Sequence, residues 1–284
     1  MLEGKICLVT GSTSGIGKEI AIGLANSGGS VVIVGRDSAK CESVVAEIAE
    51  RSGGSAPPAS ILLADLSSQS SIRNAAKEFK DRYSRLDVLV NNAGVFRACR
   101  ETTVDGIEYT FAVNHIAAFL MTNLLMDRLV SGSARVVTTS SIAHRGSRID
   151  FDDIQFERRR YNGIRAYGQS KLANILFTKE LACRLEGTGV LANCFHPGGV
   201  RTGLARGNPW YYRMIWQIIA PFLIGPEKGA DTGIYLATSD QVNSITGGYF
   251  VKRRQVTPSA EAQDAASASR LWEVSEELTG TKSR

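Results

Sequence analysis

The stretch that decides the fold of this 284-residue chain is Lys5-Ile6-Cys7-Leu8-Val9-Thr10 followed by Gly11-Ser12-Thr13-Ser14-Gly15-Ile16-Gly17. Its first six residues form a short apolar run with β-branched side chains, which is typical of a buried strand. Residues 18–26 then have the apolar spacing of a helix. A strand, a glycine turn and a helix in this order let the backbone approach a pyrophosphate at the helix N-terminus. The sequence therefore predicts a dinucleotide site that uses the turn from Gly11 to Gly17.

A second predicted strand, Ser30–Val34, closes a βαβ unit of ordinary length. Folds of this kind that use NAD commonly place an acid near the end of that strand to bind the ribose hydroxyls. Gly35 stands there instead, followed by Arg36, whose planar guanidinium suits a 2′-phosphate. We therefore expect NADP as the cofactor, and Asp37 leaves NAD as the less favoured alternative. A competing interpretation is that Arg36 and Asp37 only pair with each other in a solvated loop.

Strands and helices continue to alternate along the chain. Further strands are predicted at Ile61–Ala64, Leu86–Val90, Arg135–Thr139, Val190–Phe195 and Gly248–Val251, and the main helices at Ser38–Arg51, Gln69–Tyr83, Thr103–Val130, Tyr167–Glu186, Pro226–Thr238 and Ala260–Leu278. This order is typical of an α/β fold with a parallel sheet. No repeat, low-complexity tract or linker divides the chain, so we expect one domain.

Polar residues follow several of these strands, at the edge where ligands collect in open α/β sheets. Asp65-Leu66 ends the third strand, and its carboxylate could accept from an adenine amino group, cap the next helix, or do both. Asn91-Asn92-Ala93-Gly94 ends the fourth and suits a turn beneath a cofactor. Ser140-Ser141 ends the fifth. The sixth leads into His196-Pro197-Gly198-Gly199-Val200-Arg201-Thr202, where the glycines allow close approach to a flat ring.

Two other segments left alternatives open. Asn114 lies among apolar neighbours in the helix Thr103–Val130, and a buried amide must find partners, so it is either a structural link or holds a water in the site. Trp210–Ile224 is almost wholly apolar but too short to span a bilayer. It is a core helix, a hydrophobic substrate lid or an interfacial membrane contact.

Tyr167-Gly168-Gln169-Ser170-Lys171 is the candidate catalytic stretch. Four residues make a little over one helical turn, so Tyr167 and Lys171 are expected on one face of a helix, where the ammonium favours phenolate. Bringing the pKa of a tyrosine from about 10 to about 7 takes about 4 kcal/mol, within reach of a partly desolvated cation and a cationic cofactor ring. Such a phenol exchanges a proton at neutral pH, as general acid–base catalysis requires.

Composition argues against several classes of function. The chain is 43% hydrophobic and 21% charged with a net charge of +5, and its basic residues are scattered, so nucleic-acid binding is not expected. The five cysteines form no Cys-x-x-Cys and the three histidines lack metal-ligand spacing, which predicts free thiols, a reducing compartment and no metal. The N-terminus enters an apolar run at once and leaves no room for a signal peptide, so the expected location is the cytoplasm.

Taken together, these residues resemble the short-chain dehydrogenase/reductase family over essentially the whole chain. The matching motifs, in the family's order, are Thr10-Gly11-x-x-x-Gly15-x-Gly17, Asp65, Asn91-Asn92-Ala93-Gly94, Asn114, Ser141, Tyr167-x-x-x-Lys171 and Pro197-Gly198. The resemblance implies a single doubly wound Rossmann domain over residues 1–284, with a parallel sheet of about seven strands and a substrate lid around residues 198–225. The chain looks most like the retinol dehydrogenase branch through Gly17-Lys18-Glu19, Val113-Asn114-His115, Ser170-Lys171-Leu172-Ala173-Asn174, His196-Pro197-Gly198 and Leu271-Trp272.

The same resemblance implies hydride transfer between NADP(H) and the carbonyl or alcohol carbon of an apolar aldehyde or ketone. Tyr167 would exchange the proton, Lys171 would lower the pKa of Tyr167 and hold the nicotinamide ribose, Ser141 would donate to the carbonyl oxygen, and Asn114 would support a water. Ser140 is the alternative to Ser141. The implied cofactor contacts are Gly11, Ser12, Thr13, Ser14, Gly15, Ile16, Gly17, Arg36, Asp65, Leu66, Asn92, Ala93, Gly94, Tyr167, Lys171, Pro197, Gly198, Val200 and Thr202.

Two other functions stay open on the sequence alone. One is a soluble 3-oxoacyl or steroid ketone reductase, and the other is a non-catalytic Rossmann protein that senses NADP. Peripheral contact with a membrane is an expectation of the apolar run at Trp210–Ile224. A homo-oligomer is compatible with the resemblance, since many relatives are dimers or tetramers, but no pattern in the chain selects one.

Overall fold

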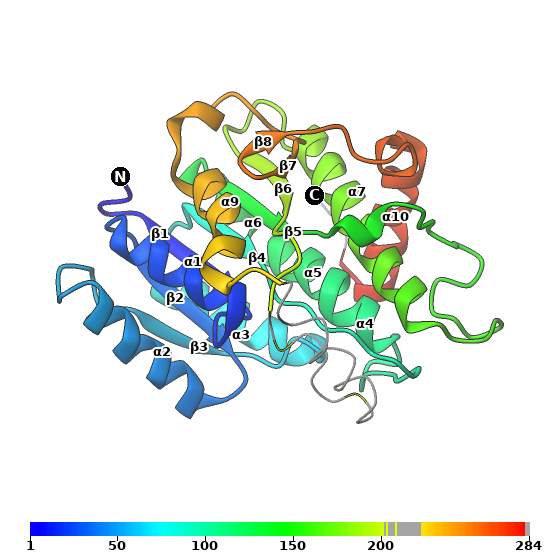
Figure 1. The fold of residues 1–284 in the computed structure, drawn as a ribbon, viewed down its shortest axis with the longest axis horizontal. Helices are drawn as coiled ribbons and strands as arrows, with labels where there is room; N and C mark the ends of the chain where they lie inside the picture. The colour runs from blue at the N-terminus through cyan, green and yellow to red at the C-terminus, as the bar shows by residue number, and fades with distance from the viewer. Residues whose placement is uncertain (202, 204–207, 209–222, 282–284) are drawn as a thin grey trace.

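An eight-stranded sheet forms the centre of the molecule (Figure 1). The computed structural model describes residues 1–201, 203, 208 and 223–281. The strands are β1 (Ile6–Thr10), β2 (Ser30–Gly35), β3 (Ser60–Leu63), β4 (Val88–Asn91), β5 (Arg135–Thr139), β6 (Leu191–His196), β7 (Tyr249–Val251) and β8 (Arg254–Gln255). Their order is β3-β2-β1-β4-β5-β6-β7-β8, parallel except for the antiparallel pair β7–β8. The predicted doubly wound α/β fold is confirmed, and the short strand β8 is an addition to it.

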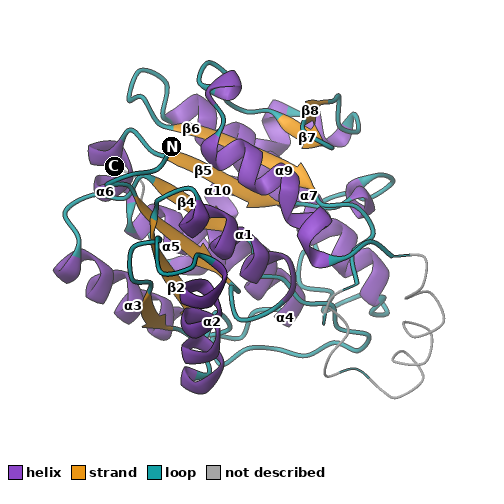
Figure 2. Ribbon diagram, turned by 60° about the vertical axis from the view of Figure 1, so that its left-hand side comes forward, coloured by secondary structure: helices purple, strands orange, loops and turns teal. Residues whose placement is uncertain are grey.

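Helices cover both faces of the sheet, and Figure 2 shows the strands between them. One face carries α1 (Gly15–Asn26), α2 (Ser38–Arg51) and α9 (Pro226–Thr238). The other carries α3 (Gln69–Arg82), α5 (Ala117–Leu124), α6 (Met126–Gly132) and α7 (Gly163–Arg184), with α10 (Ala265–Thr279) packed on α7. The chain order reverses between β1 and β4, which is where ligands bind in folds of this type.

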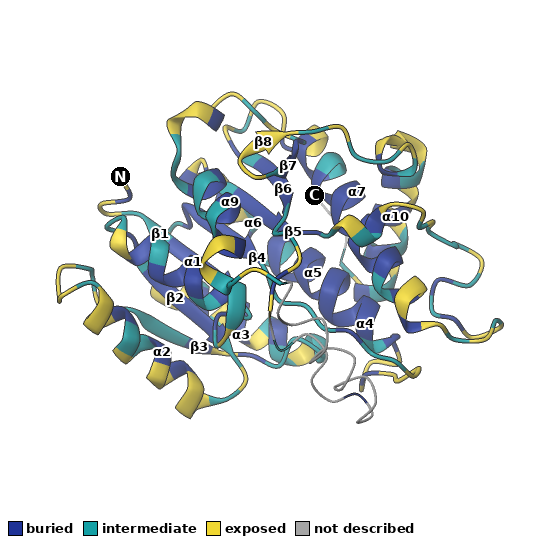
Figure 3. Cartoon of the chain, viewed as in Figure 1, coloured by how far each residue is buried: buried dark blue, intermediate teal, exposed yellow. Residues whose placement is uncertain are grey.

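The two layers follow from the two-residue period of the strands. Val9 pairs in register with Ile33 and Val90, and all three face α1. Leu8, one residue earlier, pairs with Val32 and Leu89 and faces the α3–α5 layer. Both rows are buried, as the dark strands of Figure 3 show. The strands must therefore be apolar at almost every position, because successive side chains point alternately into the cores on the two faces of the sheet.

The predicted helix Thr103–Val130 is wrong in its start and its continuity. Residues before α4 (Tyr109–Phe111) form a turn closed by a bridge between Thr102 and Glu108, and the buried Glu108 carboxylate caps α4. A π-helical turn, Ala112–Ile116, follows, and Leu125 breaks the helix again before α6.

Within the described residues no single helix is long and apolar enough to cross a membrane. The bent pair Tyr109–Leu124 and Met126–Gly132, at 66°, meets those criteria together, by length and composition.

Three predictions fall on residues that the structure largely leaves undescribed. Most of the predicted lid, residues 198–225, and of the apolar run Trp210–Ile224 lies outside the described part of the chain, as does Thr202. The lid, membrane and core interpretations of that run stay predictions.

Candidate active site

A cavity of about 680 Å³ lies along the carboxyl edge of the sheet, a volume typical of sites for small molecules and cofactors. The turns after β1 to β6 and the start of α7 all contribute to it. The structure brings together in its lining the predicted residues Gly11, Thr13, Ser14, Gly15, Ile16, Arg36, Asp65, Leu66, Asn92, Ala93, Gly94, Ser141, Tyr167, Lys171, Pro197, Gly198 and Val200.

At one end of the cavity the glycine turn leads into α1. Gly11 and Gly15 have φ values of +64° and +59°, a region that favours glycine. A Cβ at Gly11 would lie 2.8 Å from the Cα of Ala93, so the turns after β1 and β4 touch backbone to backbone. Ser14 makes no side-chain cap for α1, which leaves its first N–H groups for a ligand. The turn therefore fits a pyrophosphate.

Two residues of this turn do not line the cavity. The Ser12 side chain is buried and exchanges hydrogen bonds with the backbone of Val34, at 3.0 Å and 3.3 Å, so it ties the turn to β2. Gly17 faces inward, where a Cβ would lie 2.3 Å from Nδ2 of Asn92 and 2.5 Å from the carbonyl oxygen of Gly11. Both positions are used for packing rather than for lining the cavity, and the predicted contacts of Ser12 and Gly17 with a cofactor stay predictions.

The adenosine end of the predicted site carries two cations. A Cβ at Gly35 would lie 2.4 Å from Thr13 and 2.7 Å from Cys41, so no acidic side chain fits there. The competing interpretation, in which Arg36 and Asp37 only pair with each other, does not hold among the described residues. Asp37 instead caps α2 by accepting from the backbone N–H of Lys40 at 3.1 Å, and it accepts from the Lys40 ammonium at 2.6 Å. Arg36 is exposed and makes no ion pair with any other described residue.

The structure contradicts one of the two interpretations of Asp65, namely that its side chain caps the next helix. Ser68, not Asp65, caps α3. The Asp65 carboxylate accepts from the backbone N–H and the hydroxyl of Ser67, at 2.9 Å and 2.7 Å. These bonds hold Asp65 at the cavity wall, and its predicted contact with an adenine amino group stays a prediction.

The other end of the cavity holds Ser141, Tyr167 and Lys171. The Ser141 side chain lies close enough to the phenol of Tyr167 to influence its pKa. Burial nevertheless raises the pKa of Tyr167 to about 12, and the Ser141 contact only opposes this rise. Burial lowers the pKa of Lys171 to about 8, and its Nζ donates to the Thr139 carbonyl oxygen at 3.2 Å. Lys171 is predicted to lower the pKa of Tyr167, but for the protein chain by itself the net shift is upward. The Lys171 Nζ lies 5.6 Å from the centre of the Tyr167 ring, and desolvation of the phenol outweighs its effect.

The structure distinguishes the two candidate serines. Ser140 is buried and its hydroxyl donates to the carbonyl oxygen of Lys171 at 2.8 Å, which fastens α7 to the end of β5. Ser141 instead accepts a weak bond from the Ala143 N–H at 3.2 Å and reaches Tyr167. Ser141 is thus the serine whose side chain is near Tyr167, and its predicted catalytic role stays a prediction.

Asn114 lies in the π-helical turn, and protein groups use its amide. Its Oδ1 accepts from the Val95 N–H at 2.7 Å, and its Nδ2 donates to the Val95 carbonyl at 3.0 Å and to the Ser170 hydroxyl at 2.9 Å. Ser170 in turn donates to the carbonyl of Tyr167 at 2.7 Å. Of its two interpretations, the contacts show the structural link. The water stays a prediction.

Sequence reasoning missed several residues of the lining. Lys40 stands one helical turn beyond Arg36, and this spacing could have revealed it. Phe96 packs edge-to-face on the Tyr167 ring with centroids 6.1 Å apart, and Ile142 and Ile164 lie at the rim, 50% and 71% exposed. No local pattern marks these three, because only the folded chain brings them beside Tyr167.

A model of the short chain dehydrogenase family matches residues 5–209, which hold the glycine turn and the Tyr167–Lys171 pair. The chain belongs to this family. Over 285 residues it is 41% identical to retinol dehydrogenase 13 of Homo sapiens, covering 98% of this chain and 86% of that one. It is 42% identical to DnrU of a Streptomyces species, named as a candidate daunorubicin C-13 ketoreductase, covering 100% of this chain and 95% of that one.

Solved structures agree with this membership. A crystal structure of an uncharacterised protein from Mycobacterium paratuberculosis superposes with a TM-score of 0.79 at 33% identity, covering 100% of this chain and 96% of that one. A candidate NAD(P)-dependent gluconate 5-dehydrogenase from Beutenbergia cavernae, with bound NADP, gives a TM-score of 0.69 at 28% identity, covering 87% and 94%. The chain is an oxidoreductase of alcohol or carbonyl groups, and its family uses a nicotinamide dinucleotide.

Proposed function

We propose that this protein is an NADP(H)-dependent oxidoreductase of apolar aldehydes, ketones or the corresponding alcohols. The observation that carries the proposal is one cavity with a glycine turn at a helix N-terminus and two cations at one end, and Ser141, Tyr167 and Lys171 at the other. Bound NADP(H) would supply or accept the hydride at the second end.

Proton transfer falls to Tyr167. With its pKa raised to about 12, the phenol is protonated at pH 7 and can donate to the alkoxide that develops when a carbonyl is reduced. Ser141 lies within reach of the same oxygen and orients the carbonyl. Lys171 places a positive charge on the same face of α7, which stabilises a phenolate when the reaction runs toward the carbonyl.

The preference for NADP rests on the end of β2. Gly35 has no room for an acid, Asp37 is engaged by Lys40, and the Arg36 guanidinium is exposed at the cavity wall. Two cations and a neutralised carboxylate favour a 2′-phosphate over a bare ribose. NAD is the alternative, and a ribose would then have to displace Lys40 from Asp37.

Replacing Arg36 tests this preference. Arg36→Ala should raise the KM for NADP about 10-fold or more while changing the KM for NAD little, because a charged hydrogen bond to phosphate contributes roughly 1.5–3 kcal/mol. Arg270→Ala, an exposed arginine on α10, is the matched control and should change neither value. Equal effects of Arg36→Ala on both cofactors would remove the NADP assignment.

An apolar substrate suits the rim of the cavity. Ile142 and Ile164 are exposed there, and Phe96 packs on Tyr167, so an apolar chain would cover surface that now meets water. The relatives named as retinol dehydrogenases and as a candidate ketoreductase support an aldehyde or a bulky ketone respectively. Retinal, medium-chain aldehydes, a polycyclic ketone and 3-oxoacyl thioesters compared at fixed NADPH would separate these classes. Turnover of thioesters alone would reject the proposed class.

Location and assembly belong to the same proposal. We place the protein in the cytoplasm with peripheral contact to membranes, from which an apolar substrate would enter past Ile142 and Ile164. Sedimentation with neutral phospholipid vesicles and an activity assay with and without them test this contact. No binding to vesicles and no change in KM would reject the proposed membrane contact.

For assembly, we propose a homo-oligomer, and light scattering of the purified chain tests this proposal.

A further inference from the structure

His144 ends the short 3₁₀ turn Ile142–His144 that begins directly after Ser141. Its ring is buried and makes two hydrogen bonds in opposite directions. Nδ1 lies 2.7 Å from the carbonyl oxygen of Ser141, and Nε2 lies 3.2 Å from the backbone N–H of Ser259. A backbone N–H can only donate, so Nε2 accepts, and the proton of the neutral ring is on Nδ1, which donates to Ser141.

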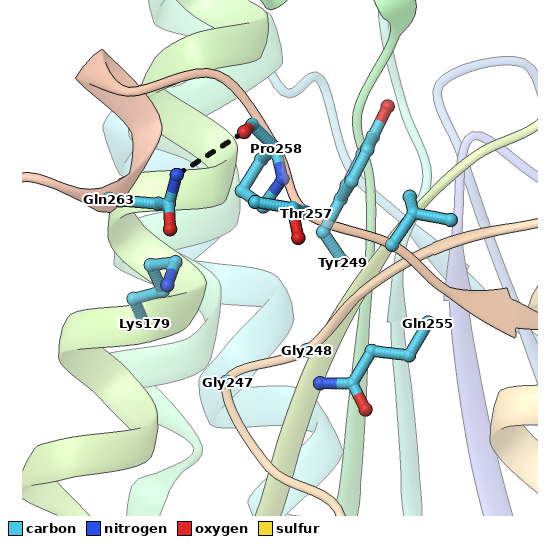
Figure 4. A pocket seen from close by; sticks show the side chains of 9 residues that line it. Lys179, Gly247, Gly248, Tyr249, Gln255, Thr257, Pro258 and Gln263 are labelled. Carbon is cyan, nitrogen blue, oxygen red and sulfur yellow. Dashed lines mark hydrogen bonds between the residues drawn. The ribbon is translucent and has the colours of Figure 1, made fainter.

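The Ser259 side of this link is firmly held. The Val256 N–H donates to the Tyr249 carbonyl at 2.9 Å, which ties the segment Val256–Gln263 to β7. Gln263 closes the segment by donating to the carbonyls of Pro258 and Ser259, at 3.4 Å each, and Figure 4 shows the first of these bonds. The His144 ring also packs edge-to-face on Tyr249, with centroids 5.0 Å apart. His144 thus contacts a segment that is hydrogen-bonded to β7 and within itself.

Ser141 is also held by the backbone around it: its carbonyl accepts from the His144 N–H at 3.2 Å, and the preceding Ser140 N–H donates to the Phe195 carbonyl at 2.8 Å. Ser141 stands at the end of β5, its Oγ accepts from Ala143 at 3.2 Å, and its hydroxyl meets Tyr167. A small rotation of this backbone would carry the hydroxyl away from the phenol. The His144 ring joins the Ser141 carbonyl to the segment Val256–Gln263, more than a hundred residues further along the chain. Arg145 adds a longer link by donating to the Thr257 carbonyl at 3.4 Å.

We propose that His144 is a positioning residue for the reaction. It holds the backbone of Ser141 against the segment Val256–Gln263 and so keeps the serine hydroxyl in reach of Tyr167 and of a substrate oxygen. The inference rests on the proposed function, and it assigns His144 no contact with substrate or cofactor. Burial lowers the pKa of His144, which keeps the ring in the neutral form that this arrangement needs.

Three substitutions separate positioning from packing. His144→Phe keeps an aromatic ring against Tyr249 and removes both hydrogen bonds. His144→Asn places an amide N–H near the site of Nδ1 and so retains the donor to Ser141, whereas His144→Gln places an amide oxygen near Nε2 and retains only the acceptor for Ser259. We expect kcat to fall about 10- to 100-fold in His144→Phe, with the KM for the cofactor little changed, because small displacements in a site cost about this much.

Rescue by the matching amide is the decisive result. His144→Asn should recover most of kcat, and His144→Gln should not, even if it is the more stable of the two. Tyr249→Phe is the control, because the Tyr249 hydroxyl has no hydrogen-bond partner among the described residues and its ring would remain. Equal kcat in His144→Asn and His144→Phe, or recovery by His144→Gln alone, would overturn the proposal in favour of packing.

A double-mutant cycle tests the route through Ser141. In a Ser141→Ala background, His144→Phe should cause no further loss of kcat, whereas a loss as large as in the wild type would show that His144 acts elsewhere. Hydrogen exchange of the Ser259 amide tests the His144–Ser259 hydrogen bond, here called the tether, without an activity assay. The amide should be protected from exchange in the wild type and should exchange faster in His144→Phe. A wild type that reduces no carbonyl would reject the proposed function and this role with it. Unchanged protection in His144→Phe would reject the tether itself.

Discussion

Tyr167 shows how one side chain depends on its surroundings for its chemistry. The helical spacing to Lys171 puts a cation nearby, yet Nζ donates to Thr139 and burial raises the pKa of the phenol to about 12. Lys171 is itself affected by burial, with its pKa lowered to about 8. With this pKa the phenol of Tyr167 carries its proton at neutral pH, as the proposed role of proton donor requires, and the Ser141 side chain is the group that opposes the rise.

Tyr167→Phe should lower turnover by about 10² to 10⁴ while leaving the affinity for NADPH nearly intact, because the proton donor is lost but the cavity keeps its shape. Steady-state kinetics and a fluorescence titration of NADPH measure the two effects. Tyr83→Phe, whose hydroxyl pairs with Ser60 away from the cavity, is the matched control. A fully active Tyr167→Phe variant would argue for the NADP-sensing alternative or for another proton donor.

The adjacent serines should respond differently to the same substitution. Ser141→Ala should reduce kcat about 10²-fold with little loss of stability, since it removes a donor at the reacting oxygen. Ser140→Ala should cost about 1 kcal/mol of unfolding free energy, because it removes the buried bond to the Lys171 carbonyl. Urea unfolding and kinetics on both variants make the comparison. The reverse pattern would exchange the roles of the two residues.

At the scale of elements, the site is built where two turns meet at the reversal of strand order. The turn after β1 and the turn after β4 touch at Gly11 and Ala93, and Asn92 donates to the Thr10 carbonyl at 3.1 Å. Gly17, in the first turn of α1, packs into the same junction. The helix N-terminus is therefore placed by close backbone contact that larger residues would prevent.

Gly17→Ala should destabilise the fold by about 1–3 kcal/mol and weaken dinucleotide binding, because its Cβ would press on the Gly11 carbonyl and on Asn92. Gly225→Ala is the control, since a Cβ there would meet no atom of the described residues within 4 Å and its φ is an ordinary −66°. Thermal unfolding with and without NADP reports both effects. If Gly17→Ala bound NADP with unchanged affinity, the junction would not set the position of the turn.

On the scale of the whole molecule, the buried His115 and the half-buried His196 link stability to pH. Burial lowers the pKa of His115 to about 3 and that of His196 to about 4, against about 6.5 in an unfolded chain. Below pH 6.5 the unfolded chain therefore binds protons that the folded chain does not. The free energy of unfolding should fall as pH drops from 6.5 toward 4, by up to about 1.4 kcal/mol per pH unit for each histidine.

His115→Asn should make this decline shallower by about one proton, whatever its effect on stability at pH 7. Chemical unfolding measured from pH 7.5 to pH 4.5 gives the slope. Above pH 7 the two proteins should run parallel, because the histidines are then neutral in both states. An unchanged slope below pH 6.5 would mean that His115 is already protonated in the folded protein or never takes up a proton.

The sequence by itself determined the alternation of strands and helices, the glycine turn, and the spacing of Tyr167 and Lys171. These are local properties, since apolar period, glycine and helical spacing act over a few residues. The apolar periodicity did not predict the breaks in the helical region after Thr103 or the strand β8. A cap by a buried Glu108 and a strand of two residues do not change that periodicity.

Only the tertiary structure decided which serine reaches Tyr167, which cation engages Asp37, and what His144 holds. Ser140 meets Lys171 across 31 residues and Ser259 meets His144 across 115. It also decided the pKa of Tyr167, because desolvation is set by every segment that packs around the phenol. Contacts between residues so far apart depend on how strands and helices come together, and no local spacing encodes that.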